Sequence, residues 1–465
     1  MNPSALTPLI LLAYLLASVM FILGLKSMSS PKTAVRGNIL GTLGMFVAIA
    51  ATLLDDHVQG YWLIGIGLIA GGLIGLWLAH TVPMTGMPEM VGLLNGFGGA
   101  ASTFVAFADL LQNDHQAVDT LIAIGLSGLI GSVTFSGSMV AYAKLKEYKQ
   151  FKQPFGLPFQ TVINAGLLLG ILLLIAFSVS TQSFVLQVLC YLAITALALI
   201  LGFFLVMPIG GADMPVVISL MNSYSGIAGA MTGFIIDNSV LIIAGSLVGA
   251  SGIILTRIMC KAMNRSLANV LFGKMAGGGK VASADEVYAN VRSTSADDIA
   301  MILDGAQRVV IVPGYGLAVA QAQHAVRDLA KVLESKGANV EYAIHPVAGR
   351  MPGHMNVLLA EADVSYDKLM EMDAINPTMD TVDVAIVIGA NDVVNPSARL
   401  DPNSPIAGMP IIDVDKARTV IVIKRSLSPG FAGIPNPLFA MPNTLMFYAD
   451  GQQAVLDIVK AVKAL

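Results

Sequence analysis

Long apolar segments fill the first 260 residues and predict helices that cross a membrane. A transmembrane helix needs about 20 consecutive apolar residues to span roughly 30 Å of hydrocarbon. About nine segments meet this requirement, at approximately residues 4–25, 37–54, 61–79, 88–108, 117–142, 161–178, 184–206, 214–236 and 239–260. We interpret the first as a membrane span and not a cleaved signal, because it lacks a basic leading region.

The pattern changes after residue 300, where short β-branched runs alternate with amphipathic stretches. Runs typical of buried strands lie at Val309–Val312, Asn339–His345, Val382–Ile388, Thr419–Ile423 and Leu445–Tyr448. Helices are expected at Leu317–Glu334, Val357–Ala362 and Gln452–Leu465. Strands that alternate with helices predict a doubly wound, Rossmann-like α/β domain. The predicted organisation is a polytopic α-helical membrane domain at 1–260, a linker at 261–300 and the α/β domain at 301–465. Within the linker, Gly273–Lys280 is flexible by composition and Ser283–Ile299 is expected to be partly helical.

Charge follows the same division. The mean hydropathy is +0.74, and residues 1–260 hold 17 charged side chains against 39 in the rest of the chain. The net charge of −4 argues against nucleic-acid binding. Cys190 and Cys260 both lie in apolar segments, so no disulfide framework is predicted.

The loops between the apolar segments predict the orientation. Basic residues lie in alternate loops: Lys26, Lys32, Arg36, Lys144, Lys146, Lys149, Lys152, Arg257, Lys261, Arg265 and Lys274. The opposite loops and span ends carry acids and histidine: Asp55, Asp56, His57, Asp109, Asp114, His115, Asp119 and Asp237. By the positive-inside rule, the N-terminus is outside and the α/β domain is cytoplasmic.

Small and polar residues recur inside the predicted spans. Glycines repeat every four residues at Gly67, Gly71, Gly75, Gly92, Gly96, Gly229, Gly233, Gly245 and Gly249, which favours tight helix packing. Asn95, Gly99 and Ser102 lie on one face of a predicted helix, and Ser219, Asn222, Ser223 and Gly226 lie on one face of another. Ser251 and Asp213 are further polar residues in or beside the predicted spans. Polar groups at membrane depth are costly. Two explanations stay open: hydrogen bonds between helices, or a narrow path for a proton or small ion.

A candidate phosphate loop follows the first predicted strand. Pro313-Gly-Tyr-Gly316 places two glycines at the spacing of a dinucleotide-binding turn, between a strand and a helix. The dinucleotide-binding fingerprint has a third glycine three residues later, where this chain has Val319. An ordinary glycine turn is therefore the alternative.

Three further loops lie at predicted strand ends, where doubly wound sheets bind ligands. The second strand ends Ile344-His345-Pro346 and lacks the acid that usually holds the ribose hydroxyl of NAD, which favours NADP. Arg350 lies in the loop that follows, which is either substrate-facing or an ordinary surface loop. His345 and His354 are not expected to bind metal, because no further ligands complete a set.

The other two strand ends carry small polar and basic residues. Gly389-Ala-Asn-Asp392 ends the buried strand at 382–388. Lys424-Arg425-Ser426 ends the next and suits the 2′-phosphate of NADP, although a solvated basic pair is the alternative. Ser428–Pro435 follows as a glycine-hinged loop that could act as a lid.

With these motifs in view, the chain resembles the β subunit of the proton-translocating nicotinamide nucleotide transhydrogenase along its whole length. The resemblance rests on Gly210-Gly-Ala-Asp-Met-Pro215, Met221-Asn-Ser-Tyr-Ser-Gly226, Met259-Cys-Lys-Ala-Met-Asn-Arg-Ser266, Pro313–Gly316, His345–Arg350, Gly353-His-Met-Asn-Val-Leu-Leu359, Gly389–Asp392 and Lys424–Ser426. It implies an enzyme of the bacterial inner (cytoplasmic) membrane that works with an α subunit, which contributes further membrane helices, as a homodimer of αβ units. It also implies that NADP(H) binds the cytoplasmic domain in an orientation reversed from the usual Rossmann mode. Hydride would pass directly to or from NAD(H) on the α subunit, coupled to proton translocation.

These patterns and the resemblance together give the expected site residues. Cofactor binding is expected at Gly314, Tyr315, Gly316, Val319, Ala320, His345, Val347, Ala348, Gly349, Arg350, Gly389, Ala390, Asn391, Asp392, Lys424, Arg425, Ser426, Gly430, Phe431, Ala432 and Asp450. The proton path and its coupling are expected at Asn95, Asp213, Asn222, Ser251 and Arg265. No catalytic side chain and no metal are expected, since hydride transfer needs alignment of two cofactors and exclusion of water.

The chain departs from the family pattern at two positions. Asn95 stands where the family often has a proton-carrying His, a role that a His of the partner subunit could take over. Phe431 stands where the family often has Tyr. The alternative function is an ion channel or secondary transporter gated by a nucleotide-sensing Rossmann domain. A tethered soluble dehydrogenase is disfavoured, since one anchor would suffice.

Overall fold

The computed structural model describes residues 3–54, 58, 60–113, 116–151, 155–272 and 287–465. The chain forms two compact units. The first comprises Met1–Ile209 and Val217–Ile254, and the second comprises Gly210–Val216 and Leu255–Leu465. The predicted glycine-rich linker Gly273–Lys280 and part of Ser283–Ile299 lie outside the described residues, as do Lys152, Lys274, Asp55, Asp56, His57, Asp114 and His115, which were used to predict orientation.

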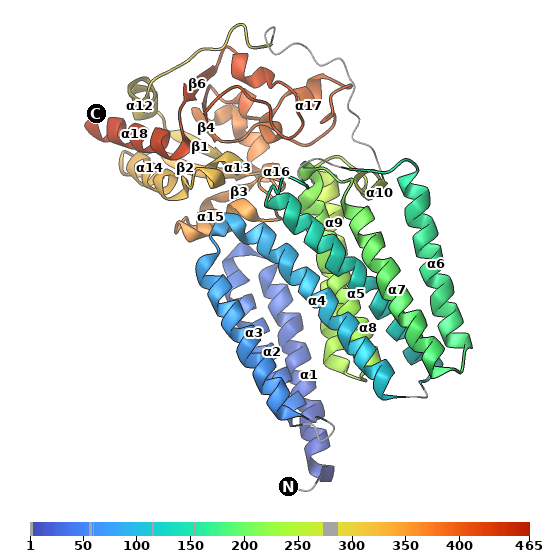
Figure 1. The fold of residues 1–465 in the computed structure, drawn as a ribbon. Helices are drawn as coiled ribbons and strands as arrows, with labels where there is room; N and C mark the ends of the chain where they lie inside the picture. Colours follow the sequence, from blue (N-terminus) through green and yellow to red (C-terminus); the bar gives the residue numbers. More distant parts are fainter. Residues whose placement is uncertain (1–2, 55–57, 59, 114–115, 152–154, 273–286) are drawn as a thin grey trace. The chain divides into compact units, whose positions relative to one another are not determined.

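Long helices make up the N-terminal half of the described chain (Figure 1). They are α1 (Pro3–Met28), α2 (Ala34–Leu53), α3 (Tyr61–Thr81), α4 (Met87–Gln112), α5 (Val118–Leu145), α6 (Gln160–Ser180), α7 (Phe184–Val206), α8 (Met214–Ile235) and α9 (Ser239–Ala262). Among the described residues, 8 helices are long and apolar enough to cross a membrane, and α8 is not one of them. The polar residues Ser219, Asn222 and Ser223 lower its hydropathy, so its crossing stays a prediction.

The glycines of α8 and α9 allow the two helices to approach closely. A Cβ atom added at Gly245 would lie 2.4 Å from the backbone nitrogen of Ala230, and one at Gly226 would lie 2.6 Å from that of Gly249. The packing predicted from glycine spacing is therefore confirmed at Gly233, Gly245 and Gly249, whereas a Cβ atom added at Gly229 would meet no atom within 4 Å.

The same prediction is wrong for α3 within this chain. A Cβ atom added at Gly67, Gly71 or Gly75 would meet no atom within 4 Å, and none of the helix's residues is buried. Spacing alone does not say whether a glycine stripe has a helix to pack against.

The sheet of the second unit is entirely parallel. Its strands are β1 (Arg308–Pro313), β2 (Asn339–Ile344), β3 (Leu369–Glu371), β4 (Val384–Ile388), β5 (Thr419–Lys424) and β6 (Thr444–Tyr448). They are arranged in the order β3-β2-β1-β4-β5-β6, and each neighbouring pair is parallel. This order is that of a dinucleotide-binding Rossmann sheet, so the predicted fold class is confirmed.

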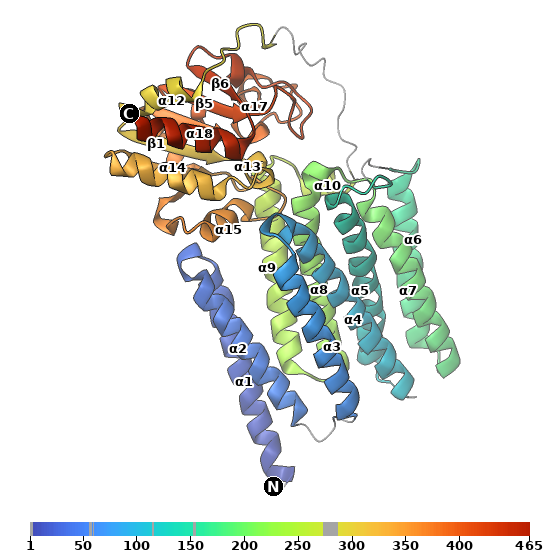
Figure 2. The same ribbon diagram turned by 60° about the vertical axis from the view of Figure 1, so that its left-hand side comes forward.

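Alternate side chains of the strands build one core on each face of the sheet. On β1, Val309 and Ile311 pack with buried residues of α12 (Ala296–Asp304), α14 (Gln323–Ser335) and α18 (Gly451–Ala464). Figure 2 shows these three helices gathered at the sheet. On the other face, Val310 and Val312 pack with Phe439 and its neighbours.

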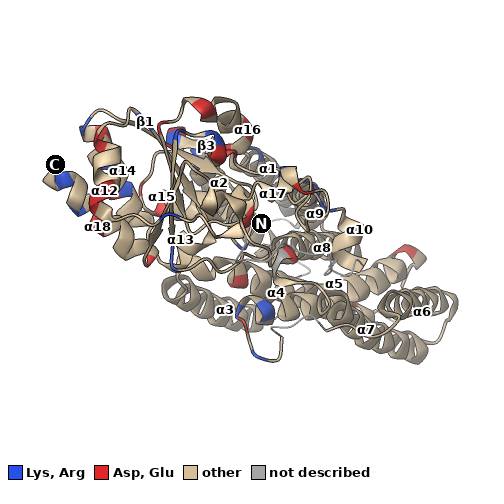
Figure 3. Cartoon of the chain, turned by 90° about the horizontal axis from the view of Figure 1, so that it is seen from above, with Lys and Arg blue, Asp and Glu red and all other residues tan. Residues whose placement is uncertain are grey.

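The remaining described helices are short. They are α10 (Leu267–Phe272), α13 (Tyr315–Val319), α15 (His354–Glu361), α16 (Met372–Ile375) and α17 (Ser397–Leu400). Acidic and basic residues are frequent in the α/β domain, whereas the long helices contain few, as the colours of Figure 3 show.

Two details of the α/β domain differ from the prediction. The single helix predicted at Leu317–Glu334 is wrong, because α13 ends at Val319 and Gln321 adopts a positive φ of 49° before α14 begins. The turn lets Leu317 and Ala322 both enter the core, and the sequence has no Gly or Pro there to announce it. The short strand β3 was not predicted.

Replacing Gly245 by Ala should destabilise the chain by about 1–3 kcal/mol, because the new methyl group would overlap the backbone of α8. Gly71→Ala is the matched control: it adds the same methyl group in open space and should be neutral or slightly stabilising. The thermal midpoint of the purified chain in detergent measures both, and equal midpoints for the two variants would contradict the packing assigned to α8 and α9.

Candidate functional site

Two glycine loops meet where the strand order reverses, between β1 and β4. The backbone N–H of Gly314 donates to the carbonyl oxygen of Ile388 (2.9 Å), and the N–H of Gly316 donates to that of Gly389 (2.9 Å). Open α/β sheets bind ligands at such a switch point, outside the carboxyl ends of the strands. The sheet topology therefore places both predicted loops at the expected ligand edge.

These loops lie so close that they exclude side chains. A Cβ atom added at Gly314 would lie 2.4 Å from the backbone nitrogen of Ala390. Gly389 has a φ of +64°, and its Cβ would lie 2.4 Å from the Cα of Gly316. Backbone packing of one loop against the other thus explains why Gly314, Gly316 and Gly389 are glycines.

Most of the predicted cofactor residues line two cavities at this edge. The first is lined, within the α/β domain, by Gly314, Tyr315, Gly316, Val347, Ala348, Gly349, Gly389, Ala390, Asn391, Asp392, Lys424, Gly430, Phe431 and Ala432. The second is lined by Gly316, Val319, Ala320, Gly389, Lys424, Arg425, Ser426 and Asp450. Gly316, Gly389 and Lys424 belong to both, so the cavities adjoin at the glycine loops.

Two predicted residues, His345 and Arg350, are absent from both linings. His345 is 1% exposed, and its Nε2 lies 2.8 Å from the carbonyl oxygen of Pro410. Its Nδ1 accepts a hydrogen bond from the N–H of Val347 (3.2 Å), so the proton is on Nε2. The ring fixes the start of the loop and does not face the cavities. The guanidinium of Arg350 lies 4.6 Å above the centre of the Tyr315 ring.

His354 is a supporting residue that sequence reasoning set aside. Its Nδ1 accepts a hydrogen bond from the backbone N–H of Arg350 (3.0 Å), and the ring fills the space beside Gly349, where a Cβ would lie 2.5 Å from that of His354. Burial lowers the pKa of His354 to about 4, with the Arg350 charge adding to the effect. The neutral ring thus holds the loop that carries Val347 to Arg350. In the sequence, the signal that could have indicated this supporting role is the position of His354, four residues after Arg350.

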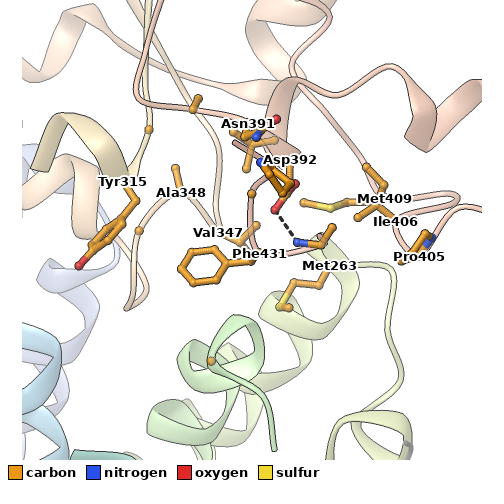
Figure 4. A pocket seen from close by; sticks show the side chains of 18 of the residues that line it. Met263, Tyr315, Val347, Ala348, Asn391, Asp392, Pro405, Ile406, Met409 and Phe431 are labelled. Atoms are coloured by element: carbon orange, nitrogen blue, oxygen red, sulfur yellow. Dashed lines mark hydrogen bonds between the residues drawn. The ribbon is translucent and has the colours of Figure 1, made fainter. Parts of the chain in front are cut away.

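Asp392 anchors the predicted lid loop. Its Oδ2 accepts a hydrogen bond from the backbone N–H of Ala432 (3.0 Å), and both lie at the cavity shown in Figure 4. A Cβ added at Gly430 would lie 2.5 Å from Oδ1 of the same carboxylate. Burial raises the pKa of Asp392, while the lid N–H groups and Lys424 oppose the shift. The loop is therefore fastened at its middle to the end of β4.

Two aromatic rings, those of Tyr315 and Phe431, line this cavity (Figure 4). The centres of Tyr315 and Phe431 lie 6.4 Å apart, and Phe431 is 50% exposed. Asn436, which was not predicted, donates from Nδ2 to the backbone oxygen and Oδ1 of Asn391 (3.1 Å each). It is fully buried and fixes Asn391 at the end of β4.

The end of β5 is basic, as predicted. The Nζ of Lys424 donates to the carbonyl oxygen of Ser428, and burial lowers the pKa of Lys424. Ser426 shares a hydrogen bond with the hydroxyl of Ser428 (2.8 Å). Arg425 is exposed at the second cavity. Two cations and two hydroxyls at one strand end suit a phosphate group.

The predicted coupling residues fall into separate environments. Nδ2 of Asn95 donates to the carbonyl oxygen of Ile218 in α8 (3.4 Å). Ser251 is exposed and bonds within its own helix. Asp213 is buried and pairs with Nη1 of Arg265 (2.6 Å); burial raises the pKa of Asp213, and the Arg265 charge counteracts part of that shift.

The polar face of α8 bonds to α9. The hydroxyl of Ser223 donates to the carbonyl oxygen of Gly249 (2.7 Å), and that of Ser219 donates to Gly252 (3.2 Å). Hydrogen bonding between helices thus accounts for the two serines. Asn222, one residue before Ser223, is half-buried.

A parallel six-stranded sheet with glycine loops at its switch point, joined to a set of long apolar helices, defines an integral membrane protein with a dinucleotide-type domain. Residues 10–461 match the family described as NAD(P) transhydrogenase beta subunit. Two curated relatives, from Rhodospirillum rubrum and from a named strain of that species, are each 48% identical over 460 residues. The alignments cover 97% of this chain and 98% of each relative, which is named "NAD(P) transhydrogenase subunit beta". The chain belongs to the NAD(P) transhydrogenase β subunit family.

The two buried histidines predict a pH dependence. Burial lowers the pKa of His345 and of His354 to about 4, below the value near 6.5 of an unfolded chain. Between these values the unfolded state binds more protons. The free energy of unfolding should therefore fall as pH drops from about 6.5 to 4, by up to about 1.4 kcal/mol per pH unit for each ring.

His354→Asn isolates one ring, because the amide oxygen can replace Nδ1 as acceptor for the Arg350 N–H. Denaturant unfolding of the purified chain should show a shallower pH slope for this variant than for the parent. His324→Asn alters an exposed ring and is the control. An unchanged slope in His354→Asn would show that the ring gains its proton without cost in the folded chain.

Proposed function

We propose that this transhydrogenase β subunit binds NADP(H) on its α/β domain and exchanges hydride with NAD(H) on an α subunit. The observation that carries the proposal is the basic end of β5, with Lys424 and Arg425, beside the paired glycine loops. A 2′-phosphate distinguishes NADP from NAD, and β2 ends in Ile344 and the buried His345 without an acid to hold a ribose hydroxyl. Residues 301–465 are the proposed NADP(H)-binding domain.

Proximity supports the proposed chemistry. Hydride transfer requires two nicotinamide rings held close together and shielded from water. The loop 428–435 is fastened through Ala432 to Asp392 and carries Phe431 opposite Tyr315. We assign this loop the role of a lid that excludes water when the cofactor is bound, with Asp450 and Val319 bordering the second cavity.

Proton translocation through residues 1–260 is the proposed source of driving force, because two nicotinamide couples differ little in energy. A proton that crosses the membrane releases about 2.3 kcal/mol per 100 mV, so a potential near 150–200 mV supplies roughly 3.5–4.6 kcal/mol. That free energy changes a binding constant by about three decades. We propose that protonation alters the relative affinity for NADP+ and NADPH, with Asn222, Asp213 and Arg265 carrying the coupling. Asn95 and Ser251 are the other proposed path residues.

The proposed setting is a bacterial cytoplasmic membrane, with the N-terminus outside, the α/β domain inside and two αβ units per enzyme. The basic loops support this orientation. The name of the Rhodospirillum relatives supports the α partner. Family membership favours the transhydrogenase over the alternative of a channel or transporter gated by a nucleotide.

Arg425→Ala should weaken NADPH binding roughly ten- to a hundredfold, since a charge-assisted hydrogen bond contributes about 1.5–3 kcal/mol. Arg418→Ala is the matched control, because Arg418 precedes the other end of β5 and pairs with Asp383. Calorimetric titration of the full chain with NADPH and with NADH gives both affinities. Equal losses in the two variants, or tighter binding of NADH than NADPH by the parent chain, would refute the assignment.

Asn222→Ala should lower the number of protons moved per hydride transferred, because Asn222 is proposed to couple protonation to the cofactor. The measurement follows acidification of vesicles that contain the αβ complex while absorbance reports hydride transfer. Thr81→Ala removes a hydroxyl that, within the part of the chain that the structure describes, bonds to the carbonyl oxygen of Trp77 in α3, and it should leave the ratio unchanged. Full coupling in Asn222→Ala would exclude this route.

A further inference from the structure

A buried carboxylate begins α4 and has no assigned role. Glu89 lies in the first turn of the helix and is only 6% exposed. Its Oε2 is shielded and, among the residues that the structure describes, has no hydrogen-bond partner. An acid in a first turn interacts favourably with the helix dipole, but a solvated side chain would do so at lower cost. Unsatisfied buried polar groups are rare and need an explanation.

Glu89 lies at one end of a polar seam between α4 and α5. Its helix face continues through Gly92 and Gly96, at i+3 and i+7. A Cβ added at Gly92 would lie 3.9 Å from the carbonyl oxygen of Ser138 and 4.0 Å from the backbone nitrogen of Tyr142. One added at Gly96 would lie 3.2 Å from the Cβ of Ser138. The face that begins with Glu89 is therefore the face that α5 covers.

The seam continues along the helices with hydroxyl groups. Ser138 is fully buried, and its Oγ is a second shielded oxygen without a partner in the described chain. Farther along, the hydroxyl of Ser127 donates to the carbonyl oxygen of Ser102 (3.2 Å) and lies 3.4 Å from the hydroxyl of Thr232 in α8. Polar oxygens thus recur along the α4–α5 seam, at Glu89, Ser138 and Ser127.

We propose that Glu89 is a proton-carrying residue of the translocation path. Its Oε2 accepts a proton at the end of the bundle where α4 begins, and releases the same proton to the oxygens of the α4–α5 seam, among them the Oγ of Ser138. The O–H bond that forms on the carboxylate breaks again in the release, and no electrons are exchanged. Ionisable groups inside membrane helices are expensive and mark such relays. Asn95, on another face of the same helix, has no titratable group. The carboxylate of Glu89 provides a titratable group on α4.

This inference rests on the proposed function, and the test separates the two. The αβ complex is reconstituted in vesicles, and hydride transfer and proton movement are recorded together. Glu89→Gln keeps the shape and hydrogen-bonding capacity of the side chain but cannot carry a proton. We expect both coupled rates to fall at least tenfold, with NADPH affinity within twofold of the parent. Glu89→Asp should keep at least a third of the parent rates.

Asp119→Asn is the matched control, because Asp119 lies in the first turn of the neighbouring α5 but is exposed; its rates should not change. Parent-like pumping by Glu89→Gln overturns the inference, as does a loss in Glu89→Asp equal to that in Glu89→Gln, which would indicate packing alone. If Glu89→Gln does not assemble, Ser138→Ala takes its place; we expect at least threefold slower pumping, and a parent-like rate overturns the inference. Hydride transfer without proton movement in the parent complex would instead refute the proposed function.

Discussion

The site of the α/β domain depends on the close contact between the loops that follow β1 and β4. Both strands are parallel and adjacent, so their carboxyl ends bring Gly314 and Gly389 to the same edge. The N–H groups of Gly314 and Gly316 donate to the carbonyl oxygens of Ile388 and Gly389, and the loops lie so close that no Cβ fits between them. Everything else at the site is arranged around this contact: the basic end of β5 on one side, and the loop held by His345 and His354 on the other.

The membrane half follows a different constraint, because polar groups in hydrocarbon must find partners. Ser219 and Ser223 bond to the backbone of α9, and glycines let the helices come close enough for those bonds. Asp213 is paired with Arg265. Glu89 is an exception to this pairing: its shielded Oε2, like the Oγ of Ser138, has no hydrogen-bond partner among the described residues.

Sequence patterns predicted the features that depend on composition and on periodicity. Val384–Ile388 is a strand because five consecutive residues are apolar and buried on both faces of the sheet. The break at Gln321 was missed because tertiary packing of Leu317 and Ala322 imposes it, and no local residue signals it. Most of the expected cofactor residues lie at the two cavities. His345 was expected at the cofactor but lies buried against Pro410, because strand-end position does not reveal the direction of a side chain.

The outer edge of β6 is closed by residues that precede the first core helix. Arg292 accepts a hydrogen bond from Met446 through its carbonyl oxygen, and Thr294 donates one back to Met446. Ser295 then starts α12 with a capping box that it shares with Asp298. An open strand edge is a template for aggregation. A fragment that begins at residue 301 would lose this covering and half of α12. A fragment that begins at residue 287 would keep the edge of β6 covered and should remain soluble at higher concentration.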